Sequence, residues 1–189
     1  ITSGKTVTVS SGDYLEVQSN LKVDGNLIFQ DSGSLIQVND NAINTGIISY
    51  ERKATVKKYD YVYWSSPVAD FDMSGIAYYV QYGWDATALN DNGGEGNWVG
   101  VSGDMTAGTG YIFRVPNSMS TTLDNFTATF TGTPLKNKKN ITVYRGNDYT
   151  TNGTLGTPRT ASDDNWNLIG NPYPSAIGVN EFLDANAAI

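Results

Sequence analysis

Residues 6–36, TVTVSSGDYLEVQSNLKVDGNLIFQDSGSLI, hold the pattern that decides the fold of the N-terminal part. Short apolar pairs recur along it and on to Ile48, and in four of the six pairs the members stand two residues apart, which is the period of a half-buried β-strand. Gly, Asn, Asp and Ser separate the pairs and favour turns. The pairs are Val7 and Val9, Leu15 and Val17, Leu21 and Val23, Leu27 and Phe29, Leu35 and Ile36, and Ile47 and Ile48. We therefore expect strands of three or four residues.

Two architectures fit such short strands. In a right-handed β-solenoid, each strand stacks on the one a coil earlier and the coils bury a continuous ladder. In a set of hairpins, Asp24-Gly25 supplies a type I′ turn. The sequence favours the solenoid, because a hairpin this short is marginal in isolation.

From Tyr59 onward the chain becomes richer in aromatic residues. In 59–64, YDYVYW, strand alternation places three tyrosines on one face and Trp64 on the other. Further strand patterns separated by turn residues predict a β-sandwich of jelly-roll or immunoglobulin-like type. These patterns are 77–81, 98–101, 110–115, 126–131, 140–144 and 166–169. One short C-terminal helix is expected after Ser175 or Asn180, either of which could cap it.

A basic cluster lies between the two patterns. Arg52, Lys53, Lys57 and Lys58 are interpreted as solvated side chains that protect a strand edge from pairing, rather than as a binding patch. We place the join between two units here. The prediction is an all-β protein with a solenoid-like segment in 1–55 and a sandwich in 56–189.

Composition narrows the function classes. Among 189 residues there is no His and no Cys, which excludes imidazole catalysis, thiolate metal sites and disulfides. The net charge of −7 disfavours nucleic acid and anionic lipid surfaces as partners. No run approaches the roughly 18 apolar residues of a spanning helix, so we expect no membrane insertion. An enzyme is not expected.

Aromatic residues flank a polar segment in the second unit. Tyr82, Trp84 and Trp98 stand on either side of 90–97, NDNGGEGN. Rings beside amides and carboxylates suit sugar binding, because the apolar face of a pyranose stacks on a ring while the polar groups bind its hydroxyls. The simpler interpretation is that Trp84 and Trp98 fill the core. Trp64 and Trp166 lie within strand patterns and are predicted to be core residues.

The same polar segment could bind calcium. Calcium takes six to eight oxygen ligands, and Asp91, Asn92 and Glu95 supply carboxylate and amide oxygens. The spacing is not that of an EF-hand, and a plain hairpin loop is the favoured interpretation. No other cofactor is indicated.

Two motifs give the chain a resemblance. YWSSPV in 63–68 and NLIGNPYP in 167–174 resemble the secreted cell-surface proteins of flavobacteria (Bacteroidota) exported by type IX secretion. The resemblance implies an extracellular or outer-surface location and an adhesin-like role, and it supplies no catalytic residues. In the relatives further strands follow NPYP. We therefore expect self-association, or completion of the sandwich by sequence beyond Ile189.

The expected function is a non-enzymatic surface module for adhesion or protein interaction. One alternative is a carbohydrate-binding module that uses Trp84 and Trp98. Another is a structural spacer or filament subunit. A glycan or a surface protein is the expected partner, and the exposure of the two tryptophans distinguishes the first alternative from the others.

Overall fold

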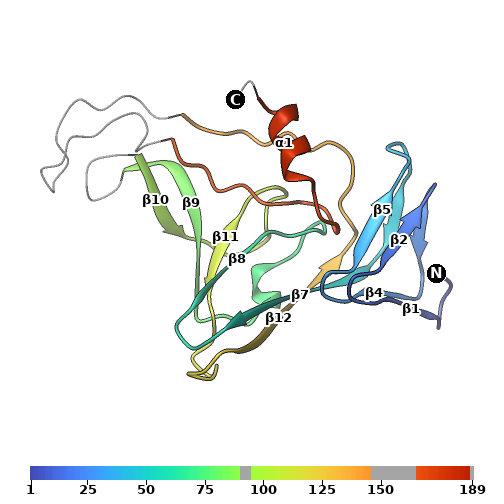
Figure 1. Ribbon diagram of the computed structural model, residues 1–189, viewed down its shortest axis with the longest axis horizontal. Coiled ribbons are helices and arrows are strands. Elements are labelled where there is room, and N and C mark those ends of the chain that lie inside the picture. Colours follow the sequence, from blue (N-terminus) through green and yellow to red (C-terminus); the bar gives the residue numbers. More distant parts are fainter. Residues whose placement is uncertain (90–94, 146–164, 188–189) are drawn as a thin grey trace, which may run out of the picture.

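The computed structural model describes residues 1–89, 95–145 and 165–187, and their secondary structure is almost entirely β-strand (Figure 1). Six short strands come first and lie together at the right of Figure 1. They are β1 (Thr6–Val9), β2 (Tyr14–Val17), β3 (Leu21–Val23), β4 (Asn26–Phe29), β5 (Ser34–Gln37) and β6 (Asn44–Gly46). The all-β prediction is confirmed.

The N-terminal strands stack in parallel, one coil on the next. Strand β1 pairs with β4, β2 with β5, and β3 with β6. Residues 20 positions apart are partners in the first two pairs, as Thr6 is with Asn26. This stacking confirms the solenoid and excludes the hairpin alternative, because β3 and β4 lie in different sheets.

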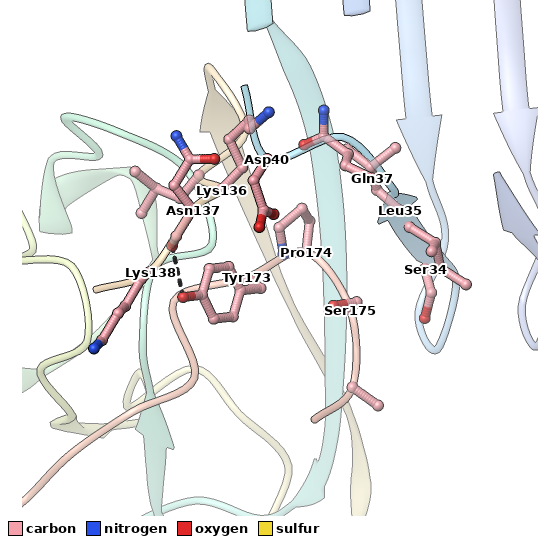
Figure 2. Close-up of a pocket in the computed structure, with 13 residues that line it drawn as sticks. Ser34, Leu35, Gln37, Asp40, Lys136, Asn137, Lys138, Tyr173, Pro174 and Ser175 are labelled. Atoms are coloured by element: carbon pink, nitrogen blue, oxygen red, sulfur yellow. Dashed lines mark hydrogen bonds between the residues drawn. The ribbon is translucent and has the colours of Figure 1, made fainter. Parts of the chain in front are cut away.

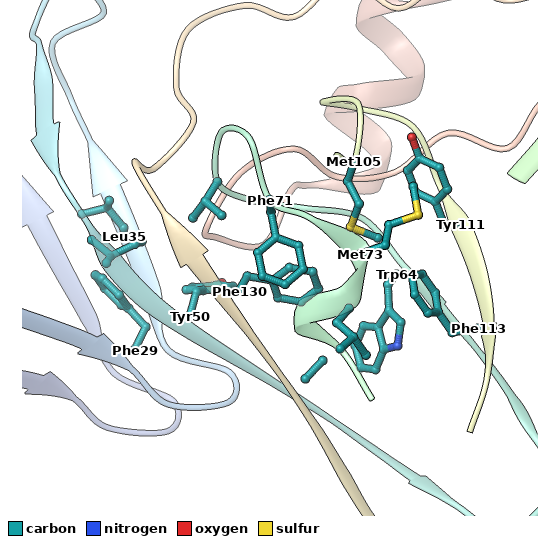
Figure 3. Close-up of a cluster of buried hydrophobic side chains, with 14 of the residues drawn as sticks. Phe29, Leu35, Tyr50, Trp64, Phe71, Met73, Met105, Tyr111, Phe113 and Phe130 are labelled. Atoms are coloured by element: carbon teal, nitrogen blue, oxygen red, sulfur yellow. The ribbon is translucent and has the colours of Figure 1, made fainter. Parts of the chain in front are cut away.

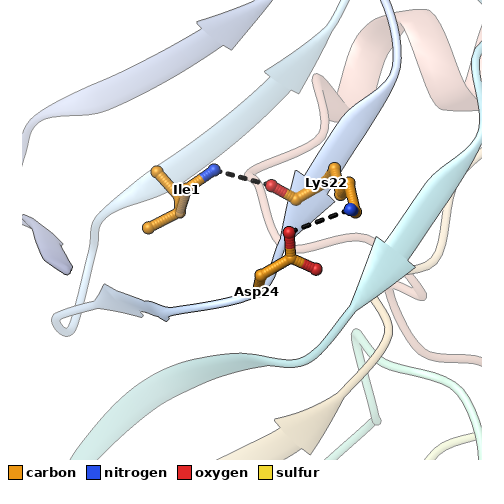
Figure 4. A network of polar contacts seen from close by, with 3 residues as sticks. All are labelled: Ile1, Lys22 and Asp24. Carbon is orange, nitrogen blue, oxygen red and sulfur yellow. Dashed lines mark hydrogen bonds and ion pairs between the residues drawn. The ribbon is translucent and has the colours of Figure 1, made fainter. Parts of the chain in front are cut away.

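Gly25 has a different role from the one a hairpin would give it. A type I′ turn requires a positive φ at this position, and the φ of Gly25 is not positive. Instead, a Cβ on Gly25 would lie 2.4 Å from the carbonyl oxygens of Thr2 and Lys5. The first residue is held nearby. The backbone nitrogen of Ile1 donates to the Lys22 carbonyl at 2.7 Å (Figure 4). The Ile1 carbonyl accepts from the Asp24 amide at 2.8 Å. Glycine therefore permits a close approach at a coil corner.

One long strand joins the two parts of the structure. Strand β7 (Ile48–Val56) pairs in parallel with β4 and, on its other side, in antiparallel with β12 (Asp124–Gly132). The expected division between 55 and 56 falls inside this strand and stays a prediction.

In the basic cluster, Lys53 and Lys57 are exposed, as expected, whereas Arg52 is half-buried. Its guanidinium stacks 4.0 Å from the centre of the Tyr50 ring, and burial lowers its pKa.

The second sheet is antiparallel, with the order β10-β9-β11-β8. Its strands are β8 (Tyr61–Trp64), β9 (Val80–Leu89), β10 (Glu95–Gly100) and β11 (Tyr111–Arg114). Its inner face packs on the first sheet, which has the strand order β1-β4-β7-β12. There the Trp64 ring lies edge-on to Phe130 at 6.1 Å. One core runs from Phe29 in the solenoid to Phe113 in this sheet (Figure 3). The predicted burial of Trp64 is confirmed.

Helical structure is limited to a 3-10 turn at Met73–Gly75 and one α-helix, α1 (Val179–Ala185), in the described residues. The helix has Gly178 as its N-cap, so the expected caps Ser175 and Asn180 are wrong. None of its residues is buried. Segments 140–144 and 166–169 do not form regular strands. Within the described residues, no helix combines the length and apolar character needed to cross a membrane.

Candidate functional site

Large aromatic side chains gather on the outer face of the second sheet. The registers align Tyr63 with Ile112, Ile112 with Tyr82, and Trp84 with Trp98. Residues paired across strands project to the same side, and so do residues two apart along one strand. We call this group the aromatic face. It consists of Tyr61, Tyr63, Tyr82, Trp84 and Trp98.

The Trp98 ring contacts two other rings of the aromatic face. Its ring meets Trp84 at 5.2 Å in a T-shaped arrangement and Tyr63 at 6.3 Å in a tilted one. The second contact reaches across the sheet, because β8 and β10 are its two edge strands. Trp98 is 38% exposed and Tyr63 is 58% exposed. The core-filling interpretation is therefore wrong for Trp98, whose ring is held by neighbours and remains open to solvent.

Trp84 is the fixed member of the pair. It is half-buried, and its indole Nε1–H donates to the carbonyl of Trp166 at 2.8 Å. The side chain of Trp166 is 68% exposed, so the prediction that it belongs to the core is wrong. Its backbone, rather than its ring, contributes to the site. A T-shaped pair such as Trp84 and Trp98 is worth about 0.5–1.5 kcal/mol beyond burial, which helps to order Trp98.

Glycine shapes the strand beneath the tryptophans. Gly96 has φ +99°, and the register between β9 and β10 shifts at this point, between Glu95 and Asn97. Gly100 stands opposite Tyr82 and has nothing within 4 Å of where a Cβ would be. The Tyr82 ring therefore has no side chain beside it on β10 at that position.

A cation lies at one end of the aromatic face. Arg114 pairs in register with Tyr61, and its guanidinium stacks 4.8 Å from the Tyr59 ring centre and 4.3 Å from that of Tyr79. One of its Nη atoms donates to Asn117 at 3.1 Å. Lys58 Nζ lies 5.2 Å from the centre of the Tyr59 ring. Among the described residues, no carboxylate forms an ion pair with Arg114 or Lys58.

The expected calcium ligands are only partly described. Asp91 and Asn92 lie outside the described residues, and Glu95 is half-buried. A hydrogen bond with Glu95 raises the pKa of Tyr144, and Glu95 Oε2 is buried without a hydrogen-bond partner. The described part of the chain has no cluster of three acidic residues that could hold a metal ion. Calcium binding at Asp91, Asn92 and Glu95 stays a prediction.

The two motifs behind the resemblance contact each other. Ser65 Oγ donates to the Asn171 carbonyl at 3.1 Å, and a Cβ on Gly170 would lie 2.3 Å from the Ser65 Cβ. Pro174 then reaches the solenoid, where its carbonyl accepts from Leu35 at 2.7 Å. Both motifs therefore fasten the C-terminal segment to the end of β8 and to β5, which is a structural role.

A cavity of about 540 Å³ lies where the C-terminal segment crosses the second coil (Figure 2). Tyr173 donates to the Asn137 carbonyl at 2.7 Å on one wall, and Lys136 donates to the carbonyls of Asn39 and Ala42. The side chains of Tyr173 and Lys136 thus bind backbone carbonyls near the end of the solenoid. We find no chemistry there comparable to that of the aromatic face.

Sequence reasoning found part of this site. It singled out Tyr82, Trp84 and Trp98, and the structure brings all three onto one face. It missed the contribution of Tyr63, Tyr61 and Arg114. The alternation in 59–64 signalled that the tyrosines share a face, but nothing local indicated which strand they would adjoin.

A family comparison covers the whole chain. No curated protein and no solved structure matches the sequence. A family described as a domain of unknown function (DUF8693) matches residues 1–189, from the first coil through α1. Since the match takes in every element described above, the chain belongs to this family.

Proposed function

We propose that this protein is a non-enzymatic extracellular surface module that binds glycans through the aromatic face. The observation that supports the proposal most is the arrangement of Trp98, which is exposed to solvent yet held by Trp84 and Tyr63. The secreted, surface-displayed location rests on the resemblance of the YWSSPV and NLIGNPYP motifs.

The exposed rings of the aromatic face leave apolar surface in contact with water, which is unfavourable. Exposed contiguous apolar patches are uncommon on soluble proteins and usually mark binding sites. A pyranose presents C–H groups on one face and hydroxyls at its rim, so a ring that is already ordered loses little side-chain entropy on stacking. Trp98 meets this condition because two neighbouring rings already restrict it.

Length also suits an extended ligand. The rows that hold Trp84, Tyr82 and Val80 follow each other along β9, at about 7 Å per two residues. From the Trp84 row to the Arg114 row the face therefore spans about 14 Å. A surface of this length accommodates more than one sugar unit of a polysaccharide.

The test is binding to an array of plant, algal and bacterial polysaccharides, followed by affinity measurements on the positive glycans. Trp98→Ala and Tyr63→Ala are expected to weaken binding at least tenfold with little change in melting temperature. Tyr14→Ala is the matched control, since Tyr14 is 64% exposed on β2, in the solenoid. It should bind as the unaltered protein does.

The outcome also separates the alternatives. Binding to no glycan, with adhesion to a surface protein retained, would favour the protein-interaction role. Concentration-dependent assembly at micromolar protein without any ligand would favour the spacer or filament role. Equal loss of glycan binding in Tyr14→Ala and Tyr63→Ala would count against the aromatic face as the site.

A further inference from the structure

The cationic end of the aromatic face has chemistry that neutral sugars do not need. The Arg114 guanidinium stacks on two rings, 4.8 Å from the centre of Tyr59 and 4.3 Å from the centre of Tyr79. Asn117 engages one Nη atom at 3.1 Å. A guanidinium has five N–H donors in a planar fork, so most of its donors remain for another acceptor.

Within residues 1–89, 95–145 and 165–187, no carboxylate pairs with this fork. Asp60 is next to Tyr61 in sequence, but its Oδ2 accepts from the Lys57 amide at 3.0 Å. No carboxylate of the described residues forms an ion pair with Arg114, and Lys58 adds a second positive charge over Tyr59. A stacked arginine with free donors matches a planar carboxylate better than a sugar hydroxyl.

The acidic character of the whole chain does not oppose an anion here. The net charge is −7, but at physiological ionic strength exposed charges more than about 8 Å apart are largely screened. At this end of the aromatic face, Arg114 and Lys58 place two positive charges over the Tyr59 ring. An anionic group brought there meets a local attraction.

We infer that the Arg114 end of the aromatic face binds the carboxylate of an acidic sugar, so that the glycan is a uronate-containing polysaccharide. In this arrangement Trp98 and Tyr63 stack on sugar rings, and Arg114 forms charge-assisted hydrogen bonds with a uronate further along the chain. Tyr59 and Tyr79 position the guanidinium. The inference rests on the proposed glycan binding and adds the class of glycan.

The experiment compares polygalacturonate and alginate with their carboxyl-reduced, neutral forms, using isothermal titration calorimetry on the full chain. The acidic forms are expected to bind about tenfold more tightly, and this preference should shrink as salt is raised. Arg114→Gln should remove the preference, so that the acidic forms bind no more tightly than their neutral forms. Arg114→Lys keeps the positive charge but loses the planar set of N–H donors. It should therefore retain only part of the preference for the acidic forms.

Lys53→Gln is the matched control, because it removes one positive charge from an exposed side chain on β7, in the other sheet. It should keep the full preference. Equal affinity for acidic and neutral forms, with both lost in Trp98→Ala, would overturn this inference and leave glycan binding standing. Absence of binding to both acidic polysaccharides would overturn it as well, and absence across the whole array would overturn the proposed function.

Discussion

Gly96 lies directly against the Trp84 indole: a Cβ built on Gly96 would be 2.5 Å from Trp84 Cζ2. The contact is made possible by a backbone with φ +99°, a region that other residues rarely adopt. The position of Trp84, and with it the T-shaped contact to Trp98, therefore depends on the absence of a side chain on the neighbouring strand. The aromatic face is therefore held by the backbone of Gly96 as well as by the contacts among its own rings.

Gly96→Ala should consequently displace Trp84 and weaken glycan binding several-fold. Strain at this φ and the clash with the ring are expected to lower the free energy of unfolding by about 1–3 kcal/mol. Urea denaturation and glycan titration measure the two effects. Gly100→Ala is the control, since its Cβ enters open space. A Gly96→Ala protein with unchanged affinity would show that Trp84 does not help to order the site.

Phe130 is expected to be the most costly core residue to truncate. It is fully buried, its ring lies 4.9 Å from Phe71 and 6.1 Å from Trp64, and it joins the two sheets. Phe130→Ala should lower the free energy of unfolding by about 3–5 kcal/mol, because it leaves a cavity. Thr129→Ala, at the adjacent exposed position, should change it by less than about 0.5 kcal/mol. Similar midpoints in urea for both variants would contradict the shared core.

Gly46 tests the stacking of the coils. It has φ +86°, and a Cβ there would lie 1.9 Å from the Val23 carbonyl oxygen, its partner in β3. Gly46→Ala should separate β3 from β6 and reduce hydrogen-exchange protection in both strands. Gly12 has a similar φ of +82° with open space around it, so Gly12→Ala carries the strain without the clash. Equal loss of protection in the two variants would mean that strain alone accounts for the effect.

Asp72 links stability to acid pH. Hydrogen bonds from Ser74 lower its pKa in the folded state below the usual 3.8. A lowered folded-state pKa gives stabilisation that is complete above the unfolded value and is lost as pH falls through the folded value. The stability difference between the protein and Asp72→Ala should therefore be complete near about pH 6 and shrink as the pH falls below about 4. Denaturant midpoints across this range provide the measurement, and a pH-independent difference would contradict it.

Much of the fold could be predicted because its signals are local. Alternation with period two in Leu27 and Phe29, interrupted by turn residues, indicates short strands wherever they pair, since side chains on a strand alternate sides. The alternation in 59–64 likewise predicted correctly that Trp64 turns inward while Tyr61 and Tyr63 turn outward. Both follow from backbone geometry alone.

The predictions that were wrong for single residues concerned features that depend on tertiary contacts. Trp166 sits in an apolar pattern yet is exposed, because its segment forms only an isolated bridge between Ile169 and Thr109. Gly25 looked like a hairpin turn, and the structure uses it for close packing of a coil corner. Neither outcome has a signal in the neighbouring residues.

The sequence by itself determined that this is an all-β chain without imidazole or thiol, with short strands at its start and a set of tryptophans and tyrosines at strand positions. Only the tertiary structure decided which of those rings meet. The order β10-β9-β11-β8 brings Trp98 to Tyr63 and sets Arg114 beside Tyr61. The physical reason is that strand pairing joins residues far apart in the chain, and local periodicity fixes the face of each side chain but not its neighbour across the sheet.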